Sequence, residues 1–345
     1  MKKPSLLLAL ALLLGPTALG QSPGVERFTF ATQTGDLSVG SGSVLSALDA
    51  RLRARKQKLS LAQLRRVPVS ITVTSEAGRL KLNFQDLNLA GLTVKAGTGD
   101  LQLSVNGNGR SRTRTRIDSR AGRVKVQVAG QPADLDLRTG TGDVSLTLSG
   151  RGTSRLQFRS DAGRFKLRST APLDQLQLTT GTGDVSAELT GALPAGSAVA
   201  FRGTAGRFDF KSSAPVGQLE VHTGTGDVTA ELNGAGPAAR VNFEGAAGRF
   251  ELRGTAPVEQ LGVKSGTGDT SVWLAPQGRT RARVESAAGR LTVYVPSTRS
   301  VQLDNPQTGT GTIEVSEAVN QGGSAHPAVF TLSMGTGDVK VLPLP

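Results

Sequence analysis

The sequence predicts an all-β chain that coils into a parallel β-solenoid, most simply a right-handed β-helix, of about 14 rungs of about 21 residues. Two observations predict this fold. A glycine followed by a charged turn residue recurs at a nearly constant interval, and apolar residues alternate with polar ones on both sides of it. A fixed period of this length is typical of repeat architectures, and strict alternation is typical of strands with one buried face.

The recurring glycine predicts a tight corner between two strands, because glycine adopts a positive φ at little cost. The next residue alternates between Asp, mostly in Gly-Thr-Gly-Asp, and Arg in Ala-Gly-Arg. Stacked rungs would place like charges about 4.8 Å apart, where they repel by about 3 kcal/mol at an effective dielectric constant of about 20. Alternation converts that repulsion into attraction, so we assign a structural role to this column: Arg79, Asp100, Arg123, Asp143, Arg164, Asp184, Arg207, Asp227, Arg249, Asp269 and Arg290.

The segments around each corner predict short half-buried strands. Val144, Leu146 and Leu148 follow one corner in alternation, and Leu156 and Phe158 precede the next. Two such strands cannot bury their apolar faces alone, but stacked rungs bury a continuous core. We assign residues 21–42 to the first solenoid strands and residues 67–345 to the solenoid repeat domain.

Residues 1–20 have the features of a signal peptide. Lys2 and Lys3 precede an apolar run from Leu6 to Leu14, and Ala18-Leu19-Gly20 fits a small-x-small cleavage site. No later segment is apolar enough for a transmembrane helix. We therefore expect an exported protein in the periplasm, on the cell surface or outside the cell.

One rung motif is missing between Asp36 and Arg79, and residues 43–66 take its place as a basic amphipathic helical insertion. Helical spacing of apolar residues predicts a helix over residues 43–56. The insertion could cap the open end of the solenoid, or it could bind a partner, and both roles stay open. Its cations are Arg51, Arg53, Arg55, Lys56, Lys58, Arg65 and Arg66.

The formal net charge of +13 favours anionic partners. A second basic cluster, Arg110, Arg112, Arg114 and Arg116, alternates along one predicted strand, so all four side chains point the same way. Both basic clusters could bind anionic polysaccharide or other envelope components, and the alternative is a solvated face. Nucleic acid is not the expected partner.

Two aromatic residues form a candidate contact surface. Trp273 and Tyr294, the only Trp and Tyr of the chain, occupy equivalent outward positions on neighbouring rungs, next to Arg253. Such a pair suits sugar rings or a partner protein, and the alternative is a pair that stiffens the sheet.

Nothing in the sequence indicates catalysis, a cofactor or a metal. The two histidines, His222 and His326, have no neighbouring Ser/Asp pattern, and the absence of cysteine excludes disulfides. The Asp corners resemble calcium-binding β-rolls, but each neighbouring rung offers Arg in place of a second carboxylate. We therefore expect a non-enzymatic protein.

The corner sequences Gly-Thr-Gly-Asp-Val-Ser-Leu and Ser-x-Ala-Gly-Arg-Phe resemble those of a bacterial adhesin-like family of β-strand-repeat domains, whose function is unknown. The resemblance covers residues 67–343 and implies a single-stranded parallel β-helix in the cell envelope. It implies no catalytic residue. The chain departs from the family in its strict Asp/Arg alternation and its basic insertion.

Three functions follow as hypotheses. The first is an adhesin-like binding or scaffolding module that contacts anionic glycans. The second is a structural rod that assembles with itself or with a partner protein. The third is a β-helix carbohydrate-active enzyme, for which the even spread of carboxylates offers little support.

Overall fold

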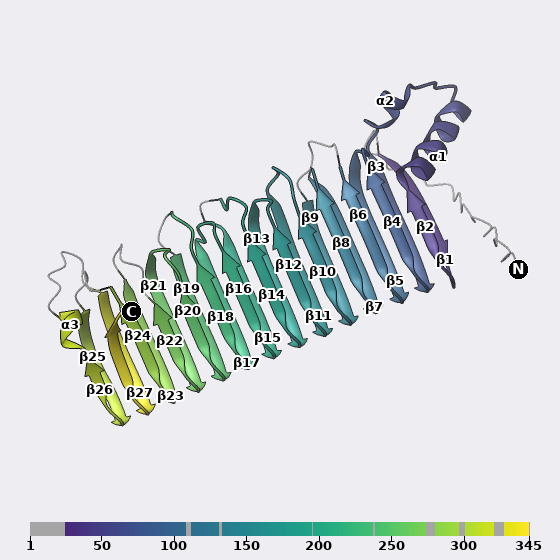
Figure 1. Cartoon of the computed structure of the whole chain (residues 1–345). Coiled ribbons are helices and arrows are strands. Elements are labelled where there is room, and N and C mark those ends of the chain that lie inside the picture. The colour runs from purple at the N-terminus through teal and green to yellow at the C-terminus, as the bar shows by residue number, and fades with distance from the viewer. Residues whose placement is uncertain are drawn as a thin grey trace, which may run out of the picture.

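A computed structural model of the chain describes residues 25–107, 112–130, 133–194, 196–236, 239–273, 280–296, 301–320 and 328–344. The predicted signal peptide at residues 1–20 and Arg110 lie outside these ranges. The described residues form two parallel sheets of fourteen strands each, stacked along a rod (Figure 1). Each rung contributes one strand to each sheet, which confirms the predicted parallel β-solenoid.

Sheet A contains the strands that precede the corners. In chain order they are β1 (Glu26–Thr32), β3 (Val69–Ala77), β5 (Leu89–Thr98), β7 (Thr113–Ala121), β9 (Ala133–Thr141), β11 (Ser154–Ala162), β13 (Leu173–Thr182), β15 (Ala198–Ala205), β17 (Gln218–Thr225), β19 (Ala239–Ala247), β21 (Val258–Thr267), β23 (Arg281–Ala288), β25 (Val301–Thr310) and β27 (Ala328–Thr336).

Sheet B contains the strands that follow the corners. They are β2 (Leu37–Gly40), β4 (Leu80–Gln85), β6 (Leu101–Asn106), β8 (Val124–Ala129), β10 (Val144–Leu148), β12 (Phe165–Ser169), β14 (Val185–Leu189), β16 (Phe208–Ser212), β18 (Val228–Leu232), β20 (Phe250–Arg253), β22 (Thr270–Trp273), β24 (Leu291–Val295), β26 (Ile313–Val315) and β28 (Val339–Pro343).

The corner glycines are required by backbone conformation and by close approach between rungs. Gly163 and Gly183, on neighbouring rungs, have φ angles of 113° and 150°. A Cβ atom built on Gly183 would lie 1.9 Å from the carbonyl oxygen of Gly163. No side chain larger than hydrogen fits this column, which explains why the glycine recurs at every corner.

The core fills the space between the two sheets with the inward residue of every alternate position. In three rungs a phenylalanine from sheet A stacks on one from sheet B across the corner, with ring centroids 4.0–4.3 Å apart. These pairs are Phe158–Phe165, Phe201–Phe208 and Phe243–Phe250. Stacked rings of this kind add to the stabilisation from their buried area.

The last rung of the chain does not lie at the end of the rod. β27 pairs with both β23 and β25, so the rung β27–β28 is inserted between β23–β24 and β25–β26. This order places Asp338 next to Arg290 and moves Thr312 to the end. The alternation of Asp with Arg therefore continues in space although it is broken in sequence.

The insertion between β2 and β3 folds as two helices at the N-terminal end of the rod (Figure 1). α1 (Ser41–Ala54) agrees with the predicted helix over 43–56, and α2 (Leu61–Leu64) begins with a capping box at Ser60. Val44, Leu48 and Leu52 are buried and join the core. A third short helix, α3 (Glu317–Asn320), follows β26.

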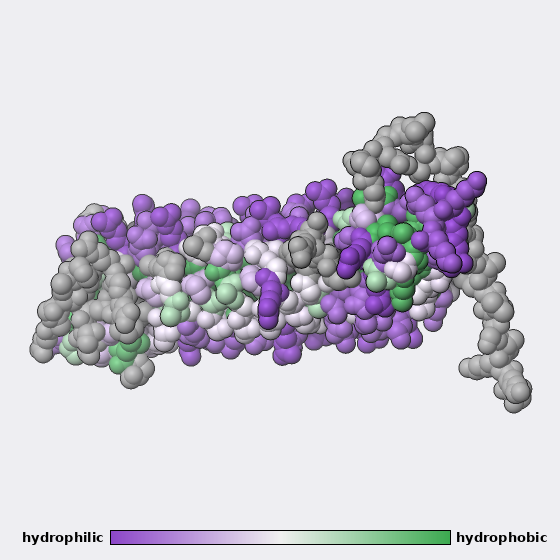
Figure 2. Space-filling model, turned by 90° about the horizontal axis from the view of Figure 1, so that it is seen from above, coloured by the Kyte–Doolittle hydropathy of each residue, from purple (hydrophilic) through white to green (hydrophobic). Residues whose placement is uncertain are grey.

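The two long edges of the rod differ. The tight corners form one edge, and longer connections and the helices form the opposite, loop edge. Figure 2 shows the loop edge from above, with hydrophilic side chains gathered along both sides and a hydrophobic patch beside the helices.

Candidate binding surfaces

In the corner column of alternating Asp and Arg, each Asp bridges to the next rung. In all seven Asp corners one carboxylate oxygen accepts a backbone N–H from the neighbouring corner, at 2.9–3.2 Å. In three of them the Arg side chain also donates to the second oxygen, at 3.1–3.2 Å. The Asp therefore satisfies a backbone donor, a role that the charge pattern alone does not predict.

These hydrogen bonds affect the ionisation of the corner carboxylates. The N–H of Arg123 bonded to Asp100 lowers the pKa of that carboxyl, with the charges of Arg123 and Arg79 acting in the same direction. The backbone N–H and hydroxyl of Thr312 likewise lower the pKa of Asp338. The corner edge is thus built to hold ionised carboxylates against cations and amides.

The corner Asp residues do not gather into a metal site. Within the ranges that the structure describes, no group of three or more His, Asp or Glu side chains is placed to hold a metal ion. Each Asp corner except Asp36 and Asp338 faces Arg on both neighbouring rungs, which opposes cation binding.

The cations of the N-terminal insertion are divided between ion pairs and free side chains. Arg51 and Arg55 both contact Glu26 on β1, at 3.2 and 2.7 Å, and Arg53 pairs with Asp49 at 2.8 Å. Arg65 lies 3.9 Å from Asp86. Lys56, Lys58 and Arg66 have no carboxylate within 4.0 Å among the described residues.

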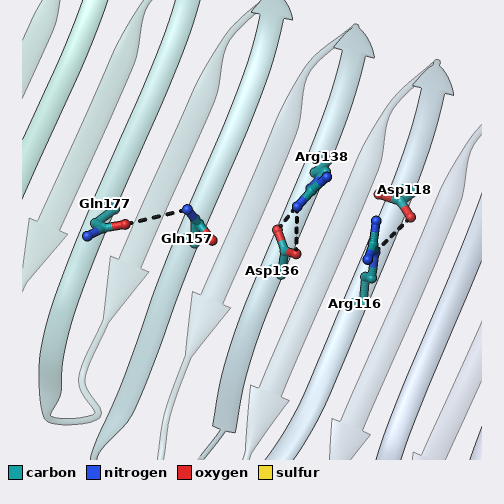
Figure 3. A network of polar contacts seen from close by, with 6 residues as sticks. All are labelled: Arg116, Asp118, Asp136, Arg138, Gln157 and Gln177. Carbon is teal, nitrogen blue, oxygen red and sulfur yellow. Dashed lines mark hydrogen bonds and ion pairs between the residues drawn. The ribbon is translucent and has the colours of Figure 1, made fainter.

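Three of the four predicted strand arginines lie in the described residues and point outward from β7 or just before it. Arg112 pairs with Asp134 at 3.1 Å, and Arg116 pairs with Asp118 at 3.0 Å (Figure 3). Arg114 has no ion-pair partner in the described part of the chain. The acidic partners, which lie on the same or the next strand, neutralise much of the expected basic stripe.

The aromatic pair forms a continuous outward stack on sheet B. The rings of Trp273 and Tyr294 lie 4.6 Å apart at an interplanar angle of 14°, and the guanidinium of Arg253 lies 4.4 Å from the Trp273 ring centroid. Leu342 is the register partner of Tyr294 on β28. The four side chains form a ladder across four neighbouring strands, and Trp273, Tyr294 and Leu342 are half-buried.

Sequence reasoning missed a long groove on the outer face of sheet A. Two cavities of about 1000 and 1100 Å³ share Thr179, Thr180 and Thr204, and together they run from β3 to β27. We call this surface the sheet A groove. Its lining is rich in Thr, Ser and Gly with charged residues of both signs between them, and no described Phe, Tyr or Trp lines either cavity.

The first glycine of five Gly-Thr-Gly-Asp corners lines this groove: Gly97, Gly140, Gly181, Gly224 and Gly266. A Cβ atom at Gly181 would lie 2.4 Å from the carbonyl oxygen of Asp161, and one at Gly224 would lie 2.4 Å from that of Thr204. The backbones of neighbouring rungs therefore approach closely there, and no side chain stands in the groove on every second rung. The sequence signal that could have identified the groove is the alternation of this glycine with Ala, Thr or a charged residue.

A row of buried hydroxyls lies beside the groove. Among the described residues one pair of these hydroxyls on neighbouring rungs is bonded directly, with Thr139 donating to Ser160 at 3.0 Å. Thr180 and Thr223 have hydroxyls with no hydrogen-bond partner among the described residues. In both cases the next rung carries Gly203 or Gly245, which offers no side-chain partner.

His222 lies in the groove with both ring nitrogens occupied. Its Nε2 lies 2.7 Å from Glu220, and its Nδ1 lies 3.1 Å from Glu244. Neither nitrogen is left to act as a base toward a substrate without breaking a carboxylate contact.

Comparison with known proteins adds a similarity over the N-terminal part of the chain. Residues 28–127 are similar to a domain described as the N-terminal domain of toast_rack, DUF2154. No curated protein and no solved structure matches the chain. Together with the fold, the similarity supports a β-strand-repeat domain and a structural repeat module, and it names no ligand or partner. Within the described residues no helix is long and apolar enough to cross a membrane.

Proposed function

We propose that the protein is a non-enzymatic, exported module of the cell envelope that binds an extended anionic glycan along the sheet A groove. The observation that carries the proposal is the groove itself, which extends from β3 to β27 and is lined by hydroxyls, glycines and charged side chains of both signs, six Lys or Arg and five Asp or Glu. A regular groove of this length suits a linear polymer better than a small molecule, which a compact pocket would enclose.

The net charge of the whole chain and the hydroxyl-rich lining of the groove favour a sugar polymer with acidic groups. The chain carries 40 Lys and Arg against 27 Asp and Glu. Hydroxyl-rich walls can exchange hydrogen bonds with sugar hydroxyls, and the absence of lining aromatics removes the stacking platform that single-stranded nucleic acid binding commonly uses. Export is supported by the features of residues 1–20, and the adhesin-like role by the resemblance of the repeats.

The test is retention of the purified chain on immobilised polygalacturonate and on neutral dextran across a salt series. We expect retention on the acidic polymer at low salt that falls steeply as salt rises, because exposed charges are screened. We expect no retention on dextran. Equal retention on the two matrices, or none on polygalacturonate at the lowest salt, would contradict the proposal.

A second candidate function, a rod that assembles end to end, rests on the outermost rung β25–β26. Its core residues Val301, Leu303, Ile313 and Val315 are only half-buried, whereas their counterparts in inner rungs are buried. A free strand edge with apolar residues is a template for pairing with another chain. Sedimentation velocity would distinguish the two functions, because the rod predicts concentration-dependent oligomers that Leu303→Lys abolishes.

A further inference from the structure

The outward column of the sheet A groove contains two arginines that break the pattern of paired charges. The column runs Arg138, Arg159, Thr179, Arg202 and His222 on β9, β11, β13, β15 and β17. Arg138 and His222 contact carboxylates at 2.7–3.3 Å. Arg159 and Arg202 have no carboxylate within 4.0 Å among the residues that the structure describes.

The neighbouring column explains why these two arginines are free. One arginine on β7 and one on β9 pair with an Asp two residues away on the same strand, as Figure 3 shows for Arg116 with Asp118 and Arg138 with Asp136. Two residues before Arg159 stands Gln157, whose amide contacts Gln177 at 3.5 Å. Two residues before Arg202 stands Ala200. At both arginines a neutral side chain thus occupies the position that carries a carboxylate beside Arg138.

The arrangement is unfavourable for the fold alone. Arg159 is the register partner of Arg138, so the two arginines extend from adjacent strands. Adjacent strands are about 4.8 Å apart. Other outward register partners carry opposite charges, as in Arg168–Glu188 and Lys211–Glu231. Two arginines without such partners are a local departure from charge pairing, of the kind expected where function requires it.

The position of the two arginines suits a ligand in the groove. They flank Thr179, which lies where the two cavities meet, and all three residues are exposed. Their strands are two rungs, about 10 Å, apart, so two flexible guanidinium groups can converge on one anionic group above the Thr179 hydroxyl. The one nearby carboxylate on these strands, Asp161, forms no ion pair with a described residue.

We propose that Arg159, Thr179 and Arg202 form an anion-binding site at the middle of the sheet A groove, and that it holds an acidic group of a linear polysaccharide. The planar guanidinium groups match carboxylate and sulfate equally, so the structure defines this shared chemistry. The inference rests on the proposed function and assigns it to one site.

Sheet B supplies a matched control. Lys125 and Lys166 flank Ser145 two rungs apart in the same cation–hydroxyl–cation arrangement, on the outer face of the opposite sheet. Their depression, of about 560 Å³, also contains three carboxylates, of Asp143, Asp184 and Asp209, and three guanidinium groups, of Arg123, Arg164 and Arg207. Removal of the two lysines changes the net charge of the chain as much as removal of the two arginines does, and it leaves the proposed site intact.

The experiment compares wild type, Arg159→Gln/Arg202→Gln and Lys125→Gln/Lys166→Gln by calorimetry with polygalacturonate, dextran sulfate, neutral dextran and single-stranded DNA. We expect the arginine variant to weaken binding of the acidic polysaccharides about 10-fold or more, and the lysine variant to weaken it less than about 3-fold. The two polysaccharides distinguish carboxylate from sulfate as the preferred group. Thermal unfolding of each variant checks that the fold is kept, and Thr179→Val, with no change in charge, should weaken binding by a smaller factor.

The outcomes separate the two proposals. If wild type binds the acidic polysaccharides and the arginine variant binds as wild type does, or if the two variants lose affinity equally, the site is wrong and the proposed function stands. If wild type binds none of the acidic polysaccharides, both are wrong. Tighter binding of single-stranded DNA than of either polysaccharide would overturn the ligand class.

Discussion

The two long edges of the rod solve the same problem in different ways, because each must turn the chain from one sheet to the other. At the corner edge the turn is a glycine with positive φ. It is followed by Asp or Arg on every rung except the outermost, β25–β26, where Thr312 follows the glycine. At the loop edge the connections vary in length and accommodate α1, α2 and α3. The corner edge fixes register, and the loop edge tolerates insertion.

The comparison of the two edges indicates where the backbone geometry constrains the choice of residue. At the corner a neighbouring backbone lies within about 2 Å of the place that a Cβ atom would occupy. At the loop edge some glycines have open space around them, as at Gly196. Substitutions at matched positions on the two edges can therefore measure how much of the stability depends on the corner geometry.

The largest expected effect is at the corner glycines. Gly206 and Gly196 both have positive φ. A Cβ atom at Gly206 would lie 2.2 Å from the Gly183 carbonyl oxygen, whereas a Cβ atom at Gly196 would have no described heavy atom of another part of the chain within 4 Å. We expect Gly206→Ala to cost about 3 kcal/mol or more, and Gly196→Ala about 1 kcal/mol from backbone strain alone. Chemical denaturation followed by circular dichroism would measure both, and equal losses would refute the distinction between the edges.

The corner edge was predictable from sequence because one physical constraint repeats there. Positive φ selects glycine, and stacking selects alternating charge, so strand order and the inward faces follow for twelve of the fourteen rungs. The exchange of the rungs β25–β26 and β27–β28 was not predicted, although the alternation of Asp and Arg implies it. Only an inserted β27–β28 places Asp338 beside Arg290, with Thr312 at the end.

The binding surfaces were less predictable because they depend on neighbours from other rungs. The sequence shows that Arg112 and Arg116 point outward, but not that Asp134 and Asp118 neutralise them. The pair Arg159 and Arg202 was not identified from the sequence, because only the strand register shows that no carboxylate on an adjacent described strand pairs with either arginine. Such a feature emerges only once the register is known.

The next largest effect concerns side chains that bridge rungs. Asp143 accepts the backbone N–H of Arg164 at 3.1 Å on the corner edge, and Asn233 accepts that of Thr255 at 3.3 Å on the loop edge. We expect Asp143→Ala to cost about 1–2 kcal/mol and Asn233→Ala about 0.5–1 kcal/mol, because hydrogen bonds to charged acceptors are stronger. Thermal unfolding would show the order, and a larger loss at Asn233 would contradict it.

The corner carboxylates also make the corner edge sensitive to acid. The pKa of Asp100 is lowered in the folded state, so its contribution to stability is present above the unfolded pKa, about 3.9, and is lost as pH falls through the lower folded pKa. We expect the unfolding temperature to fall in this window below about pH 4, and Asp100→Asn to reduce that dependence. An unchanged pH dependence of the unfolding temperature in the variant would show that Asp100 does not contribute to the acid sensitivity.

The smallest effect tests a contact at the end of β22 farthest from the corner. Arg253 lies over the ring of Trp273, so its removal exposes the indole to water and removes a cation–π contact worth about 0.5–1 kcal/mol. Because Trp273 is the only tryptophan, its fluorescence reports this site alone. We expect Arg253→Ala to shift the emission to longer wavelength and to lower the unfolding temperature slightly, while Arg253→Lys retains most of both. An unshifted emission in Arg253→Ala would mean that the stack with Tyr294 is sufficient to keep the Trp273 ring in place. Ring packing, and not the charge of Arg253, would then order this end of sheet B.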